Sequence, residues 1–264
     1  MNTAPIPEVD PLDCCAGSTQ AMAAAIRSHD WSQTVLGPPE SWPQSLRSAL
    51  SICLGSSFQI AIYWGPRLGL LYNDDWAPIL GSKHPWALGR PAAEVWPEIW
   101  DTIGPLFERV VTTGEPTRST DQLLAMHRHG FVEECYFDYS FSPVRGEGGK
   151  VGGIFNAVVE TTFRVIAQRR TELLQTLSEV LARSSTAHEA WRFALQALDG
   201  DRHDIPFAVL YMLEPGDPPQ VVCAGAAGAV LPPSAAAGRF RLEDDASPWP
   251  LRRVLEGGCS SQAC

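Results

Sequence analysis

The clearest pattern of hydrophobic and polar positions lies in residues 88–114. Five apolar residues recur there at spacings of one, three and four, which is typical of an amphipathic helix. We expect Pro97 in a first helical turn, a break at Pro105, a second apolar face over residues 106–111 and an end at Gly114. Such a helix needs a sheet to cover. The five residues are Val95, Trp96, Ile99, Trp100 and Ile103.

Stretches rich in β-branched and aromatic residues flank this region and predict a sheet of five antiparallel strands. A glycine-rich turn at residues 146–149 joins the last two strands and is a strong hairpin signal. The central helices fall between the second and third strands, so we expect an α+β fold with helices packed on one face of the sheet. The strands are predicted at residues 58–64, 70–73, 117–126, 132–142 and 151–159.

The N-terminal region is expected to be loosely attached. Residues 1–29 are predicted to form a flexible tail because their start is polar and proline-rich, with one short helix at residues 21–27. A second helix is expected to begin after Ser41 as its N-cap, with Pro43 in its first turn.

A long helix is predicted after the sheet, at residues 161–183. Its apolar residues lie seven, four and three positions apart, a heptad-like stripe that Arg170 interrupts. Two alternatives remain open. The stripe packs on the domain that follows, or it pairs with a second copy and makes the chain a homodimer through this linker helix. The stripe consists of Ile166, Leu173, Leu177 and Val180.

An ordered set of motifs across residues 30–165 resembles the PAS domains found at the N-terminal end of many bacterial sensor histidine kinases. The segments that carry the resemblance are DWSQTVLGPPESWPQSLRSAL (30–50), LLYNDDWAPILGSKHPWALG (70–89), GRPAAEVWPEIWDTIGP (89–105), RHG (128–130), YFDYSFSPVRGEGGKVGGIF (136–155) and VVETTFRV (158–165).

The C-terminal part opens with a helix at residues 187–198 and strands at 207–213 and 220–226, an order that resembles the start of a GAF domain. Fewer than 100 residues follow the long helix, so we expect this domain to be incomplete. Residues 247–258 are expected to form a helical turn. The expected organisation is a tail (1–29), a PAS domain (30–162), a signalling helix (163–184) and a truncated GAF-like domain (185–264).

The resemblance implies a sensory input module of bacterial two-component signal transduction, which relays a PAS-domain signal through the helix to a histidine kinase output. A phospho-acceptor site at His188 has little support because the residues after it do not continue the pattern, and we expect this chain to lack the kinase core. One alternative is the N-terminal piece of a kinase. Another is a purely structural dimerisation module without a ligand.

A small-molecule ligand is a further expectation, since the PAS fold has a cavity between the sheet and the central helices. The alternative is that the aromatic residues only fill the core, because burying them stabilises the fold with or without a ligand. The candidate ligand-binding residues are Tyr72, Asn73, Trp76, Trp86, Trp96, Trp100 and Tyr139.

Other chemistry has weaker signals, and no cofactor is identified. His127 and His129 could join the acidic residues and Cys135 across the hairpin in a metal site, or simply be solvated turn residues. His84 is either a loop residue or a haem ligand. Neither Cys53 nor Cys135 lies in the Asn-Cys-Arg context of a flavin adduct.

The composition narrows the list of partners. A formal charge of −10 argues against nucleic acid and anionic membranes, both of which favour basic surfaces. The N-terminus does not resemble a signal peptide, and no apolar run approaches the length of a membrane span. Seven irregularly spaced cysteines are typical of reduced thiols. We therefore expect a cytoplasmic protein without direct membrane insertion.

Overall fold

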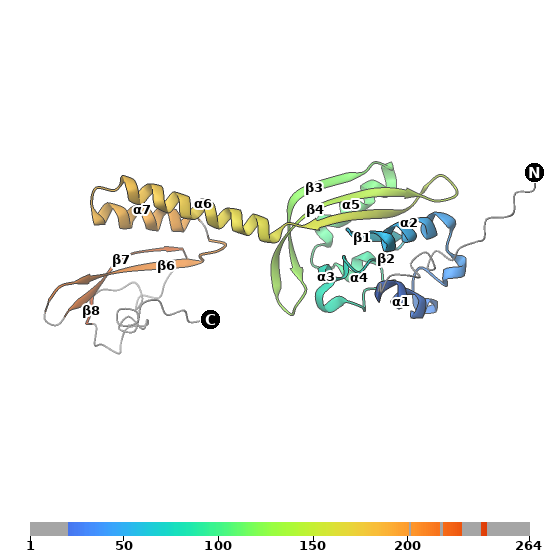
Figure 1. Ribbon diagram of the computed structural model, residues 1–264, viewed down its shortest axis with the longest axis horizontal. Coiled ribbons are helices and arrows are strands. Elements are labelled where there is room, and N and C mark those ends of the chain that lie inside the picture. The colour runs from blue at the N-terminus through green and yellow to red at the C-terminus, as the bar shows by residue number, and fades with distance from the viewer. Residues whose placement is uncertain (1–20, 201, 217–218, 229–238, 242–264) are drawn as a thin grey trace, which may run out of the picture. The chain divides into compact units, whose positions relative to one another are not determined.

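The computed structural model describes residues 21–200, 202–216, 219–228 and 239–241 (Figure 1). It divides into two compact units, Met1–Val165 and Ile166–Cys264. The expectations for residues 1–20 and 247–258 lie outside the described residues.

The first unit contains the predicted five-stranded antiparallel sheet, in the order β2-β1-β5-β4-β3. The first and last strands are neighbours inside the sheet, with Ile62 opposite Phe155, and β2 and β3 form its two edges. With the helices that pack on it, this arrangement confirms the α+β class. The strands are β1 (Gln59–Trp64), β2 (Gly69–Tyr72), β3 (Thr117–His127), β4 (Val132–Arg145) and β5 (Val151–Glu160).

The second and the fifth helix of this unit have 12 and 14 residues, and its other helices are shorter. The helices are α1 (Ala21–Ser28), α2 (Gln44–Gly55), α3 (Ala77–Leu80), α4 (Ala92–Val95) and α5 (Trp100–Thr113), with 3₁₀ turns at Trp31–Gln33, Pro39–Ser41 and Gly81–Lys83. Among these, α5 packs on β4 and β5, whereas α2 contacts β1, β2 and β4.

The first helix, α1, differs from the flexible tail expected over residues 1–29. Met22 and Ile26 on α1 are buried in the core, and the Met22 N–H donates to Asp74 Oδ1 at 3.0 Å. Apolar burial and this hydrogen bond fix α1 to the folded unit.

The start of α2 also differs from expectation, because Pro43 and not Ser41 occupies the N-cap. Ser41 ends a 3₁₀ turn, where its hydroxyl donates to the Pro38 carbonyl at 2.7 Å. Trp42 between them is extended, as a residue before proline prefers.

The central helical region breaks at a different proline from the one expected. The backbone of Trp96 is not helical, with φ −121° and ψ 46°, because Pro97 follows it. Helices α4 and α5 are therefore separate. By contrast, Pro105 lies inside α5. The residue before Pro105 is Gly104, which has no Cβ to clash with the proline ring, so the helix continues.

In the second unit, α7 (Ala187–Asp199) packs on an antiparallel sheet of β6 (Phe207–Glu214), β7 (Gln220–Gly228) and β8 (Arg239–Arg241). Thr186 caps α7 by accepting a hydrogen bond from the Glu189 N–H, as expected of a helix start. The helix and the first two strands follow the expected order. The GAF-like assignment of this unit remains a prediction.

Helix α6 (Thr162–Arg183) begins in the first unit and continues in the second. The predicted stripe residues Leu173 and Leu177 are half-buried. More exposed apolar side chains lie at Leu174 and Leu181, which are 64% and 48% exposed. No helix among the described residues combines the length and apolar character needed to cross a bilayer.

Candidate functional site

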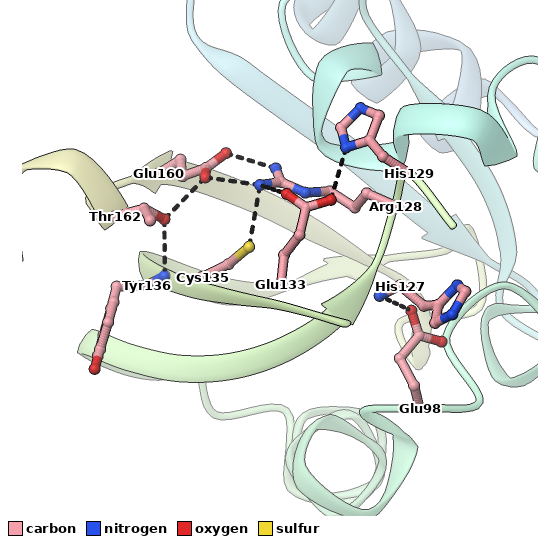
Figure 2. A network of polar contacts seen from close by, with 9 residues as sticks. All are labelled: Glu98, His127, Arg128, His129, Glu133, Cys135, Tyr136, Glu160 and Thr162. Carbon is pink, nitrogen blue, oxygen red and sulfur yellow. Dashed lines mark hydrogen bonds and ion pairs between the residues drawn. The ribbon is translucent and has the colours of Figure 1, made fainter. Parts of the chain in front are cut away.

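A polar cluster joins the turn between β3 and β4 to the end of β5, and its centre is Arg128 (Figure 2). The Nη1 of Arg128 donates to Glu160 Oε2 at 2.9 Å, and Nη2 donates to Glu160 Oε1 at 3.2 Å. Nη2 also lies 3.0 Å from Glu133 Oε2 and 3.0 Å from Cys135 Sγ. We call Arg128, Glu133, Cys135, Glu160 and Thr162 the Arg128 junction.

Thr162 connects the junction to the first turn of α6. Its hydroxyl donates to Glu160 Oε1 at 2.8 Å and accepts the backbone N–H of Tyr136 on β4 at 2.9 Å. The N–H of the preceding Thr161 donates to the Tyr136 carbonyl at 2.7 Å. The start of α6 is therefore bonded to both β4 and β5.

Burial and charge act in opposite directions in the junction. Burial alone would lower the pKa of Arg128, but hydrogen bonding and charge from Glu160, with Cys135 and Glu133, raise it. For Glu133, burial opposes ionisation, whereas His129 and Arg128 together lower its pKa. Burial raises the pKa of the Cys135 thiol to about 11, although Arg128 partly offsets the rise. The junction thus contains one cation, two carboxylates and a protonated thiol at neutral pH.

The two turn histidines have different surroundings. His129 Nδ1 lies 2.6 Å from Glu133 Oε1, at the exposed edge of the junction. The His127 N–H donates to Glu98 Oε1 at 3.2 Å, and Figure 2 places this pair apart from Arg128. Within the described ranges, no group of three or more His, Cys, Asp or Glu side chains is arranged to hold a metal ion.

A cavity of about 40 Å³ lies between the sheet and the central helices. Three of its lining residues have a buried polar atom without a hydrogen-bond partner: Trp76 Nε1, Tyr139 Oη and Asn156 Oδ1. Two other polar groups of the cavity wall pair with each other, because Trp96 Nε1 donates to Tyr63 Oη at 3.1 Å. The remaining walls are apolar and include Ile79, Ile103, Leu124, Met126, Phe137 and Val158.

Of the seven residues predicted for a ligand site, the structure brings Trp76, Trp96 and Tyr139 to this cavity. Trp86 is 49% exposed, and the Arg90 guanidinium lies 4.3 Å from its ring centre.

Three other predicted residues also lie outside the cavity lining. Trp100 packs edge-on against Phe107. Tyr72 Oη is 3.0 Å from His84 Nδ1, which gives His84 a local partner. Asn73 uses its carboxamide on the backbone, with Nδ2 2.7 Å from the Phe58 carbonyl and Oδ1 3.2 Å from the Ile60 N–H.

Sequence reasoning missed Asn156 and Arg128. Asn156 has a visible signal, since it is the one polar residue in the inward-facing series Ile154, Asn156 and Val158 on β5. Arg128 has none beyond its place in the RHG segment, because its partners Glu133 and Glu160 are brought together only by strand pairing.

No protein-family model matches the chain. Several solved structures are similar to part of it. A sensory box sensor histidine kinase from Vibrio cholerae is 15% identical over 46% of this chain and 97% of its own, with a TM-score of 0.30. The PAS domain of histidine kinase ThkA is 23% identical over 38% of this chain and 98% of its own, with a TM-score of 0.29. A LOV protein of Rhodobacter sphaeroides is 12% identical over 58% of this chain and 92% of its own, with a TM-score of 0.38.

Proposed function

We propose that the first unit is the sensory input part of a two-component signalling system. Occupancy of the cavity changes the position of β4 and β5, and the Arg128 junction passes this change to the start of α6. The output is a histidine kinase and its response-regulator pathway in the cytoplasm, so the chain performs no catalytic step of its own.

One observation carries the proposal: the cavity wall and the Arg128 junction share a strand pair. Phe137 and Val158 both line the cavity, and Phe137 pairs in register with Glu160. Glu160 in turn accepts hydrogen bonds from Arg128 and Thr162. A displacement of β5 at Val158 therefore acts within two residues on the carboxylate that fixes α6.

Physically, the relay is a shift between two packed arrangements of the junction. A ligand shifts such an equilibrium only by its difference in affinity for the two arrangements. A cavity lined by side chains from β3, β4 and β5 can supply that difference in affinity. A bound ligand favours the arrangement in which these strands lie farther from the central helices.

We also propose a homodimer through α6. Arg170, Leu174 and Leu181 lie four and seven residues apart, which places them on one face of the helix. The exposure of Leu174 and Leu181 also favours a second candidate function, a dimerisation module without a ligand. The second unit includes most of this helix, and the residues that follow the helix are proposed to have the GAF-like character expected from the sequence.

The relay is tested by adding a methyl group to the cavity wall with Val158→Ile. Hydrogen exchange at the amides of Tyr136, Thr161 and Val165, which are bonded across or after the junction, should change at least threefold. The matched control is Val144→Ile, the same change on β4 outside the cavity lining. Unchanged exchange in Val158→Ile, or an equal change in the control, would contradict the relay and leave the dimerisation module as the better account.

A further inference from the structure

The residues that line the cavity carry an unusual share of the unpaired polar atoms in the described part of the chain. Six buried side-chain nitrogen or oxygen atoms there have no hydrogen-bond partner, and three of the six belong to residues that line the cavity. Their residues, Trp76, Tyr139 and Asn156, are only 2%, 5% and 6% exposed. Buried polar groups are nearly always paired in folded proteins, so three unpaired groups at one cavity indicate a missing partner.

The three atoms require a partner with both kinds of hydrogen-bonding group. The indole N–H of Trp76 can only donate, so it needs an acceptor. The Asn156 Oδ1 accepts and needs a donor, whereas the Tyr139 hydroxyl can do either. Burial raises the pKa of Tyr139, so this hydroxyl is protonated at neutral pH.

The walls select an uncharged partner. No residue that lines the cavity carries a charge, and most of the lining is aliphatic or aromatic. An ion moved from water into such a site would lose its hydration without gaining a counter-charge. The charged side chains of the Arg128 junction are absent from the lining.

The size of the cavity sets the size of the partner. A volume of about 40 Å³ corresponds to roughly three water-sized probes. A molecule of about three or four non-hydrogen atoms matches this space. Large cofactors exceed it in the arrangement seen here.

We propose that the cavity binds a small uncharged molecule that combines a hydrogen-bond acceptor and donor in a group of the primary carboxamide kind. The acceptor faces Trp76, the donor faces Asn156, and Tyr139 bonds to either group. The apolar remainder of the molecule contacts side chains such as Met126 and Ile103. This inference rests on the proposed function in taking the cavity as the input site, and it adds the chemical class of the ligand.

The test uses three isosteric probes on the full chain at pH 7: acetamide, which is neutral, acetate, which is an anion, and acetamidinium, which is a cation. The readout is the indole N–H resonance of Trp76 in an NMR spectrum, assigned by its loss in Trp76→Phe. Acetamide should shift this resonance saturably. Acetate and acetamidinium should bind at least tenfold more weakly.

Two variants and one control identify the polar contacts. Tyr139→Phe and Asn156→Leu should each weaken acetamide binding at least tenfold. Thr117→Val is the matched control, because Thr117 Oγ1 is also buried and unpaired but does not line the cavity, so binding should stay within twofold. Tyr139→Phe removes a single oxygen atom, so the test stands even where Asn156→Leu prevents folding.

The proposal is overturned by the absence of a saturable shift with acetamide, by equal binding of either ion, or by equal weakening in Thr117→Val. Amide exchange at Thr161 and Val165, measured in the same samples, separates this proposal from the relay. Acetamide binding without altered exchange upholds the ligand class and contradicts the relay. Altered exchange in Val158→Ile without acetamide binding contradicts the ligand class and upholds the relay.

Discussion

Arg128 holds both carboxylate oxygens of Glu160, at 2.9 and 3.2 Å, at the point where β5 ends and α6 begins. The side chain of Arg128 is 10% exposed and that of Glu160 is 26% exposed. A bidentate pair of this kind fixes orientation as well as distance. The last residue of the sheet is therefore positioned by the turn between two other strands.

Replacing Arg128 with Met should destabilise the first unit by about 3–5 kcal/mol, because Glu133 and Glu160 would be left together without their cation. The free energy of unfolding, measured in urea by tryptophan fluorescence, gives this cost. Arg67→Met is the matched control, since the Arg67–Glu94 pair is exposed and should contribute no more than about 1 kcal/mol. Equal costs for the two changes would argue against a special role for the junction.

Replacing Asn73 with Ala should lower the free energy of unfolding by about 3 kcal/mol or more. Asn73 is buried, and several buried backbone groups would lose the hydrogen bonds that its side chain makes. The same urea experiment measures it. Gln44→Ala, which removes an exposed carboxamide bonded to Ser48, should change stability by less than about 0.5 kcal/mol. A small effect at Asn73, with ligand binding lost, would instead return this residue to the binding role expected from the sequence.

The Cys135 thiol should make stability fall as pH rises from 9 to 11. Its pKa is raised from 9.0 to about 11 in the folded chain, so the unfolded chain loses this proton first and ionisation favours unfolding across that window. A rise of two pKa units corresponds to a loss of at most about 2.7 kcal/mol in the free energy of unfolding, and none of this loss occurs below pH 9.

The control for this pH effect is Cys135→Ala, which removes the ionisable group. Burial also raises the pKa of Cys53, so both proteins should lose stability in alkali. The variant should have the shallower slope between pH 9 and 11, measured by urea unfolding at fixed ionic strength. Parallel slopes would show that Cys135 ionises equally easily in both states.

Replacing Arg170 with Leu should tighten dimerisation. Arg170 is 65% exposed, and its 3.3 Å pair with Asp204 contributes little, so the change adds an apolar side chain to the face that carries Leu174 and Leu181. Sedimentation velocity over a concentration series should show the dimer at lower concentration. Gln168→Leu adds the same side chain two residues away, on the opposite face of α6. This change should leave the concentration at which the dimer forms unaltered. Identical behaviour of Arg170→Leu and the unaltered chain would contradict a dimer seam on this face.

The sequence was informative where local rules decide the structure. The β-branched and aromatic residues of β4 and β5 and the glycine-rich turn at 146–149 predicted those strands to within three residues at each end. Local rules also explain Pro97, because the restriction on the residue before proline applies to Trp96. They were misleading at Pro105, which lies inside α5 after Gly104, a residue without a Cβ to clash with the proline ring.

The candidate site was only partly predictable, because its residues meet through strand register. Trp76 and Tyr139 could be selected as aromatic residues of the right region, but nothing local distinguishes them from Trp86, which remains half exposed beside Arg90. The pairing of Arg128 with Glu160 spans 32 residues and depends on how β3, β4 and β5 align. Such long-range ion pairs leave no periodic trace in a sequence.

The central claim is that the cavity acts on α6 through the hydrogen bonds of Thr162, and a double-mutant experiment tests it most directly. Hydrogen exchange at the Val165 amide is measured for Val158→Ile, alone and combined with Thr162→Val, which keeps the shape of Thr162 but removes its bonds to Glu160 and Tyr136. The account predicts that Val158→Ile changes this exchange at least threefold with Thr162 present and by less than 1.5-fold without its hydroxyl. The same response in both backgrounds would contradict the account.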